Sequence, residues 1–237
     1  MRKSVIKMDN ILWTFLLTLT VYLLLSLLQR KTRLAILNPL LFSSIVIILF
    51  LLLFNIEYEK YEKGTEFITF LIKPATVSLA IPMYQNMVLL KDHFKKIIIT
   101  IFIGVFTHAS LILLFAYLFN FDNELIATFI PKSLTTAVAI GVSESLGGLV
   151  YLTISIVIIT GIIGLSISDL IFKILNINSP IAKGLSLGIS SHALGTSKAS
   201  SYGNVEASVA TLSLILTSIF TVLLSPLFYK LIVYLLN

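Results

Sequence analysis

Three segments hold almost all of the polar side chains in the apolar part of this chain. They are KPATVSLAIP from Lys73, PKSLTTAVAIGVSESLGG from Pro131 and GLSLGISSHALGTSKAS from Gly184. Lysine supplies a positive charge, serine and threonine hydroxyls form hydrogen bonds, and glutamate or histidine can carry a proton. These residue types are suited to binding a small anion and to moving a proton with it.

The positive charges available for such an anion are lysines. Arginine is confined to the ends of the first apolar segment, at Arg2, Arg30 and Arg33. No arginine can therefore hold a carboxylate in the core through two parallel hydrogen bonds. An anion would depend on Lys73, Lys132 or Lys198, on hydroxyls and on free N–H groups at helix starts. This favours modest affinity for a small monocarboxylate, as a carrier requires.

Two ionisable residues are candidates for carrying a coupling proton. Glu144 lies beside two glycines with little countercharge nearby, and His192 is flanked by serine, glycine and threonine. An ionisable group inside a membrane segment is costly, and this indicates a function. His108 stands alone in its segment and is expected to be packed or singly hydrogen-bonded. Asp169, near the end of a segment, is expected to lie at the membrane interface.

Structural alternatives stay open for the same residues. Lys73 and Lys132 can extend from the ends of spans to water. The hydroxyls can bond to their own or a neighbouring helix and hold helices together. The glycines can either permit close helix crossing or allow the backbone to break inside the membrane.

The composition sets the fold class. The chain has 237 residues, of which 57% are hydrophobic and 12% charged, whereas about 25% are charged in soluble domains. The sequence therefore predicts an all-α polytopic membrane protein, a single integral domain over 1–237 in the plasma membrane. At about 20 residues per span, seven or eight segments fit, including broken or re-entrant helices. The net charge of +6 is assigned to loops at lipid headgroups, and no nucleic-acid partner is expected.

Hydropathy gives the order of the segments. Spans are expected at 11–28, 38–55, 97–118, 125–142, 149–172 and 205–227, and the one at 125–142 contains the Pro–Lys interruption. The charged stretch 57–66 is expected to be a solvated loop. Segments 67–83 and 184–203 are expected to be broken, because prolines or glycines interrupt them. When the sequence is compared with itself at an offset of about 111 residues, regular and interrupted segments occur in the same order. This predicts two repeats, 9–120 and 121–237, as in inverted-repeat transporters.

Catalytic and metal-binding signatures are missing. The chain has no cysteine, and its three histidines lie on separate segments. It contains no HExxH, no Gly-x-Ser-x-Gly and no phosphate-binding loop. The prediction is a protein that is not an enzyme, with no cofactor and no metal.

Taken together, the motifs resemble those of the LrgB/CidB family. The order NPLL, KPATVSLAIPMYQ, PKSLTTAVAIGVSESLGG, TGIIG and GLSLGISSHALGTSKA is similar to that family over essentially the whole chain. The resemblance implies a bacterial antiholin-like or holin-like membrane protein with an LrgA/CidA-type small membrane partner. It also implies a role in control of murein hydrolase activity, autolysis and programmed cell death. A plastid branch looks like a glycolate/glycerate transporter, and other members look like transporters of pyruvate or related carboxylates.

The resemblance also implies a set of site residues. Carried over to this sequence, the substrate-binding positions are Lys73, Thr76, Lys132, Ser133, Thr135, Thr136, Ser191, His192, Gly195 and Thr196, with Pro74 and Pro131 beside them. Proton or ion coupling falls on Glu144 and His192. Two departures put an identical substrate in doubt. Ala137 follows the paired threonines where the family usually has proline, and Glu206 is followed by Ala207 and Ser208 instead of Gly-Ala.

Two functions follow as hypotheses. The first is a carrier of pyruvate-, glycolate- or glycerate-like carboxylates whose site lies where the three interrupted segments converge, in a protein expected to form homo-oligomers. The alternative is an antiholin-like regulator that acts through its holin-like partner without transporting a substrate itself.

Overall fold

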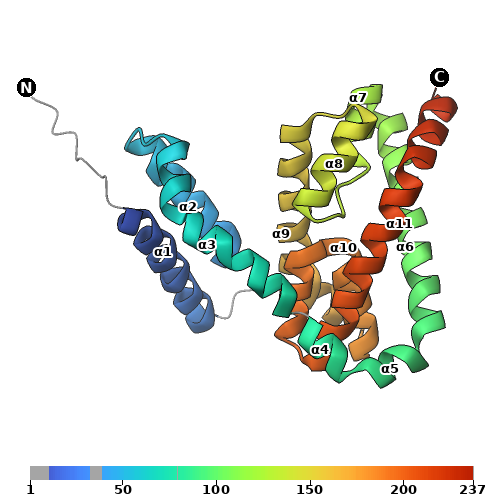
Figure 1. Ribbon diagram of the computed structural model, residues 1–237, viewed down its shortest axis with the longest axis horizontal. Coiled ribbons are helices and arrows are strands. Elements are labelled where there is room, and N and C mark those ends of the chain that lie inside the picture. Colours follow the sequence, from blue (N-terminus) through green and yellow to red (C-terminus); the bar gives the residue numbers. More distant parts are fainter. Residues whose placement is uncertain (1–10, 33–38, 79, 237) are drawn as a thin grey trace, which may run out of the picture. The chain divides into compact units, whose positions relative to one another are not determined.

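The computed structural model describes residues 11–32, 39–78 and 80–236, and these residues form helices and connecting turns without a strand (Figure 1). The all-helical prediction is confirmed. The chain divides into two compact units, residues 1–78 and 79–237.

The first unit contains three helices, α1 (Ile11–Thr32), α2 (Pro39–Leu53) and α3 (Tyr58–Ser78). In this unit α1 packs against both α2 and α3. The hydroxyls of Thr18 and Tyr61 are 2.7 Å apart, and the rings of Phe15 and Phe67 meet edge to face. Much of the remaining leucine and isoleucine surface is exposed, as expected of helices that face lipid.

The prediction of a solvated loop at 57–66 was wrong, because α3 already begins at Tyr58. Glutamate and lysine are good helix formers, and Lys60 pairs with Glu57 at 3.1 Å. The helix then continues past Pro74 to Ser78, and the next helix begins at Ala80. The side chains of Lys73 and Thr76 lie outside the described part of the chain.

The second unit is made of eight helices within the described residues. They are α4 (Ala80–Gln85), α5 (Met87–Asp92), α6 (Phe94–Phe119), α7 (Asn123–Phe129), α8 (Thr136–Leu146), α9 (Val150–Ile174), α10 (Pro180–Ser200) and α11 (Asn204–Leu236). Its core lies where α6, α10 and α11 pack against one another and where α9 packs against α10.

Four described helices are long and apolar enough to cross a membrane. They are α1, α6, α9 and α11, and α2 and α8 supply two shorter apolar stretches. The expected spans at 11–28, 97–118, 149–172 and 205–227 are therefore found as long helices. The expected span at 125–142 is instead divided between α7 and α8, and the interrupted segment at 184–203 forms α10 and the turn after it.

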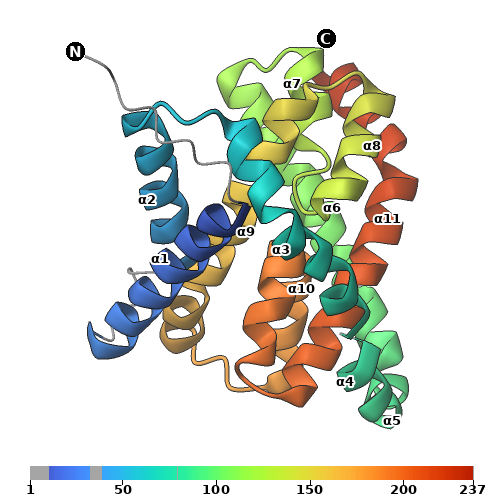
Figure 2. The ribbon, with the colours of Figure 1, turned by 60° about the vertical axis from the view of Figure 1, so that its left-hand side comes forward.

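α10 is a helical hairpin that turns back at His192. That residue has φ 42° and ψ −132°, which no helix contains. A Cβ on Gly195 would collide with the carbonyl oxygen of Leu187, so the second leg lies directly against the first. Lys183 and Lys198 both reach the ring of Tyr202, at 5.5 and 5.1 Å, although a straight helix would separate them by about 22 Å. Figures 1 and 2 show α10 beside α9 and α11.

The break in α10 decides between the two roles that the sequence left open for its glycines. The residue with the irregular backbone is His192, and the nearby glycines instead permit close packing. Gly195 admits the opposite leg of the hairpin, and Gly161 of α9 admits the His192 ring, which a Cβ there would meet at 2.7 Å. Glycine is used here because it has no side chain, and a histidine occupies the positive-φ position.

α7 and α8 form a second hairpin, whose tip is the turn at 130–135. α7 is capped at its start by Asp122, which accepts a 2.8 Å hydrogen bond from the N–H of Leu125. α8 ends at Gly147 with φ 79°, a left-handed residue that stops helices. The base of this hairpin is tied to the start of α9, because the Leu149 N–H donates to the Thr128 hydroxyl at 2.8 Å.

The two hairpins enter from opposite ends of α9. The α7–α8 hairpin is joined to the N-terminal end of α9, and both ends of the α10 hairpin lie at its C-terminal end, where α11 begins. A hairpin followed by a long span therefore occurs twice in residues 123–236, in opposite directions. The longer repeats, 9–120 and 121–237, stay a prediction.

We expect Gly195→Ala to destabilise the protein. The added methyl group would displace the Leu187 carbonyl and force the legs of the α10 hairpin apart, at a cost of about 1–3 kcal/mol. The thermal midpoint of the purified protein in detergent should therefore fall by several degrees. Gly141→Ala is the matched control, because a Cβ there meets nothing within 4 Å. Equal midpoints for the two variants would contradict the hairpin packing.

Candidate functional site

A cavity of about 380 Å³ lies between α9 and the first leg of the α10 hairpin. The tip of the α7–α8 hairpin supplies Lys132 to it, and the other lining residues come from α9 and α10: Thr160, Ile163, Gly164, Ile167, Ser168, Ile171, Phe172, Ser186, Leu187 and Ser190. The site is therefore a mainly apolar cavity with four hydroxyls and one cation.

Lys132 stands at the tip of its hairpin, in the turn between α7 and α8. The ion pairs in the described part of the chain are Lys60–Glu57 and Lys198–Asp169, so Lys132 has no carboxylate partner among the described residues. A charge in a cavity of low polarity is costly unless an opposite charge approaches it. This lysine therefore favours binding of an anion.

His192 holds the tip of the α10 hairpin against the middle of α9. Its Nε2 lies 2.9 Å from the carbonyl oxygen of Val157, so Nε2 carries the proton and donates. Its own carbonyl accepts a 3.0 Å hydrogen bond from the Thr196 hydroxyl. The side chain is 4% exposed. A non-glycine residue in a strained backbone conformation marks a position whose surroundings enforce it. The structure thus gives His192 a positioning contact, and its coupling role stays a prediction.

The two hairpin tips meet the same stretch of α9. From Phe172, near the base of the α10 hairpin, to Val157, at its tip, α9 rises about 22 Å. That length exceeds half of a hydrocarbon core of about 30 Å. Since Lys132 shares its cavity with Ser190 of the α10 tip, both hairpins reach the interior of the bundle.

Of the site residues expected from the sequence, Lys132 lines the cavity, and the others in the second unit lie at or near the two hairpin tips. Ser133 is buried beside Lys132, Thr135 is the N-cap of α8, and Thr136 is the first residue of that helix. Ser191 lies at the α10 tip, where its hydroxyl is 3.0 Å from that of Ser190. Gly195 and Thr196 form the start of the second leg and are buried.

Glu144 is not among the residues that line the cavity. Glu144 is exposed and lies in the last turn of α8, about 12 Å along the helix from Thr136. Its coupling role stays a prediction. Lys73 and Thr76 belong to the first unit, and their contribution also stays a prediction.

Sequence reasoning missed the α9 wall of the cavity. Thr160, Gly164 and Ser168 lie at intervals of four residues and line it together, because such positions share one helix face. This polar and small stripe inside an expected span was the signal that could have found them.

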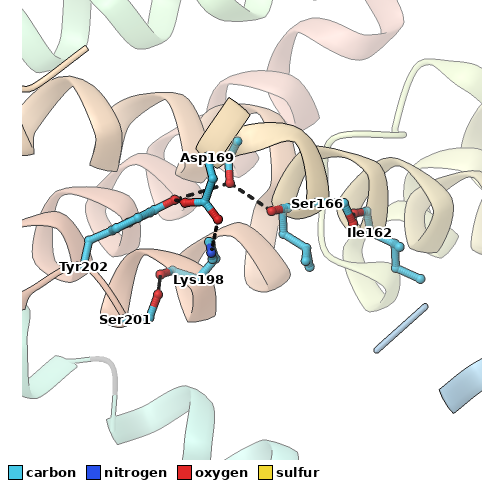
Figure 3. Close-up of polar contacts among 8 residues, drawn as sticks. Ile162, Ser166, Asp169, Lys198, Ser201 and Tyr202 are labelled. Atoms are coloured by element: carbon cyan, nitrogen blue, oxygen red, sulfur yellow. Dashed lines mark hydrogen bonds and ion pairs between the residues drawn. The ribbon is translucent and has the colours of Figure 1, made fainter. Parts of the chain in front are cut away.

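A charged cluster closes the base of the α10 hairpin (Figure 3). Lys198 contacts Asp169 of α9 at 2.7 Å, and the Tyr202 hydroxyl donates to the same carboxylate. Burial, and then the hydrogen bond to Asp169, raise the pKa of Tyr202 above its ordinary value, so this phenol stays a donor. Asp169 was expected at the interface, and it fixes both the end of the second leg and the turn before α11.

Among the described residues, no group of three or more histidine and acidic side chains could hold a metal ion. The family comparison gives a match to the LrgB-like family model over residues 18–231, which is most of the chain.

The chain belongs to the LrgB-like family.

This is a family of membrane transporters and regulators and not of enzymes. Family membership and the four candidate spans together make this LrgB-like chain a multi-pass membrane protein. No solved structure matches it.

We expect a cysteine at position 190 to report the charge of the cavity. The chain has no cysteine, so Ser190→Cys provides a single thiol. An anionic methanethiosulfonate reagent should label it several-fold faster than a cationic one, because Lys132 attracts anions. Lys132→Gln should remove this preference.

Ser155→Cys serves as the control, because Ser155 is an exposed position on α9 outside the cavity. An equal charge preference at positions 155 and 190, or a charge preference at 190 that Lys132→Gln leaves unchanged, would contradict the site.

Proposed function

We propose that this LrgB-like protein is a carrier of small monocarboxylates of the pyruvate, glycolate or glycerate type, in the plasma membrane. The observation that supports this best is Lys132, a lysine without a carboxylate partner among the described residues, in the cavity where two helical hairpins meet.

The size and lining of the cavity favour a small ligand. Its volume of about 380 Å³ is near the lower end of the range for ligand sites, about 300–1,000 Å³. Isoleucine and leucine side chains form much of the wall, with hydroxyls from α9 and α10. One positive charge against an apolar wall suits one carboxylate with a short carbon chain.

A single lysine also suits release of the ligand. Lysine acts as one point charge, whereas arginine can hold a carboxylate through two parallel hydrogen bonds. A carrier must bind its substrate and then give it up on the other side. Modest affinity at Lys132 agrees with this requirement.

The opposed hairpins suit alternating access. The α10 hairpin fills the bundle from the C-terminal end of α9, and the α7–α8 hairpin fills it from the N-terminal end. In this proposal, displacement of one hairpin opens the site to one side of the membrane while the other keeps it closed. The two hairpins and α2 would complete the seven or eight membrane segments expected from the sequence.

The regulatory role is part of the same proposal. Transport of carboxylates would influence control of murein hydrolase activity, autolysis and programmed cell death, together with an LrgA/CidA-type partner. The alternative, an antiholin-like regulator that transports nothing, does not require a lysine without a carboxylate partner in a cavity. We also propose three further features of the carrier. They are proton coupling through Glu144 or His192, substrate binding by Lys73 and Thr76, and a homo-oligomeric state.

We expect Lys132→Gln to abolish most carboxylate uptake. In liposomes with the purified protein, labelled pyruvate, glycolate and glycerate are offered with and without a pH gradient. Loss of a charge-assisted contact of about 1.5–3 kcal/mol should raise KM roughly tenfold or more.

Lys96→Gln is the matched control, because Lys96 is exposed in the first turn of α6. If the unmodified protein takes up none of the three acids, with or without its partner, the carrier function is wrong. If both variants transport alike, Lys132 is not the binding residue.

A further inference from the structure

Three buried polar atoms have no hydrogen-bond partner among the described residues. They are Nε2 of His108 on α6 and the hydroxyl oxygens of Thr217 and Thr221 on α11. Each threonine is only 2% exposed. An unpaired polar group is costly in a protein interior. The cost is higher at membrane depth, because the hydrocarbon core contains no water that could bind the group. These atoms therefore indicate a ligand.

The two threonines differ from the other hydroxyl residues of their own helix. The hydroxyl of Thr211 donates to Ala207 O at 2.8 Å, and that of Ser213 donates to Val209 O at 2.6 Å. This bond to the carbonyl four residues earlier is the usual way to satisfy a hydroxyl inside a helix. Thr217 and Thr221 do not make it, so their hydroxyls remain available to a ligand.

His108 lies close to the tip of the α7–α8 hairpin. Ile112, one turn later on α6, packs in the same cluster as Ile130, and Ile130 is two residues before Lys132. Lys132 is also near enough to interact electrostatically with His108. The free Nε2 atom and the unpaired ammonium group therefore belong to one region.

The two threonines lie at the level of the same tip. Val138, in the first turn of α8, lines a groove together with Ser218 and Val222 of α11. Thr217 and Thr221 immediately precede these two residues and turn toward the buried side of α11. Since α8 begins directly after the turn that carries Lys132, the threonines are placed beside that turn.

We propose that His108, Thr217 and Thr221 form a hydrogen-bonding subsite next to Lys132, which binds the oxygen substituent beside the carboxylate of the substrate. This rests on the proposed function, in which Lys132 binds the carboxylate. Hydroxyls and an imidazole nitrogen donate to, or accept from, a neutral hydroxyl or oxo oxygen. An unsubstituted acid would leave the three groups unpaired, so the subsite selects 2-hydroxy and 2-oxo acids.

Binding of matched acids to the purified protein tests this. Glycolate and acetate differ by one hydroxyl, and ligand-dependent thermal stabilisation in detergent gives an apparent Kd for each. The unmodified protein should bind glycolate more tightly than acetate. Thr217→Val and Thr221→Val remove one hydroxyl and keep the shape. Each should weaken glycolate binding about fivefold and leave acetate binding unchanged.

Two further variants separate the outcomes. Thr211→Val is the matched control on α11, because that hydroxyl is already bonded to the backbone, and it should leave the glycolate-to-acetate ratio unchanged. Lys132→Gln should weaken both acids. The subsite would be overturned if Thr217→Val and Thr221→Val leave the ratio of the glycolate and acetate Kd values unchanged, which includes the case in which both acids bind more weakly by the same factor.

Uptake of glycolate into liposomes, measured with the same protein preparations, distinguishes failure of the subsite from failure of the carrier function. Uptake that persists with an unchanged ratio in both valine variants overturns the subsite alone. Binding with the expected ratios but no uptake overturns the carrier function alone. No stabilisation of the unmodified protein by either acid overturns the subsite.

Discussion

A backbone that reverses direction inside a membrane must have its freed N–H and C=O groups satisfied by protein, and the second unit of this chain is organised around that constraint. Both hairpin tips are placed against α9, where side chains and backbone of the bundle surround them. The contact from His192 to Val157 O fixes one tip. The other tip brings Lys132 to the cavity that α9 and the first leg of the α10 hairpin line.

The same arrangement explains where the charge lies. A lysine in a continuous apolar helix would extend toward the nearest interface. Lys132 instead follows Pro131 in a turn, so the backbone itself carries it into the bundle. The side chain then lines the cavity with Ser190 and Thr160. A hairpin tip thus places one cation inside the bundle. It also requires a short irregular segment, which the neighbouring helices must bury.

The sequence predicted the elements that depend on composition and local pattern. Long apolar runs gave α6, α9 and α11, and proline or glycine next to polar residues located the interruptions that became the hairpins. It did not predict the residue at the break of α10. Glycine is the usual positive-φ residue, whereas here packing against α9 holds His192 in that conformation. The α9 wall and the threonines Thr217 and Thr221 of α11 were also missed. The sequence of an apolar helix does not show whether a hydroxyl bonds to its own backbone or faces a cavity.

The two hairpin bases differ in chemistry, and this bears on how each could move. Thr128, Ser143 and Thr153 tie the base of the α7–α8 hairpin through neutral hydrogen bonds among fully buried side chains. At the base of the α10 hairpin, Asp169, Lys198 and Tyr202 form a charged cluster that is partly exposed. Exposed ion pairs contribute little net free energy and weaken with salt, whereas buried hydroxyl bonds inside a bundle have no water to exchange with. The base of the α10 hairpin is therefore held by contacts for which water can substitute, whereas the base of the α7–α8 hairpin is held by contacts that water does not reach.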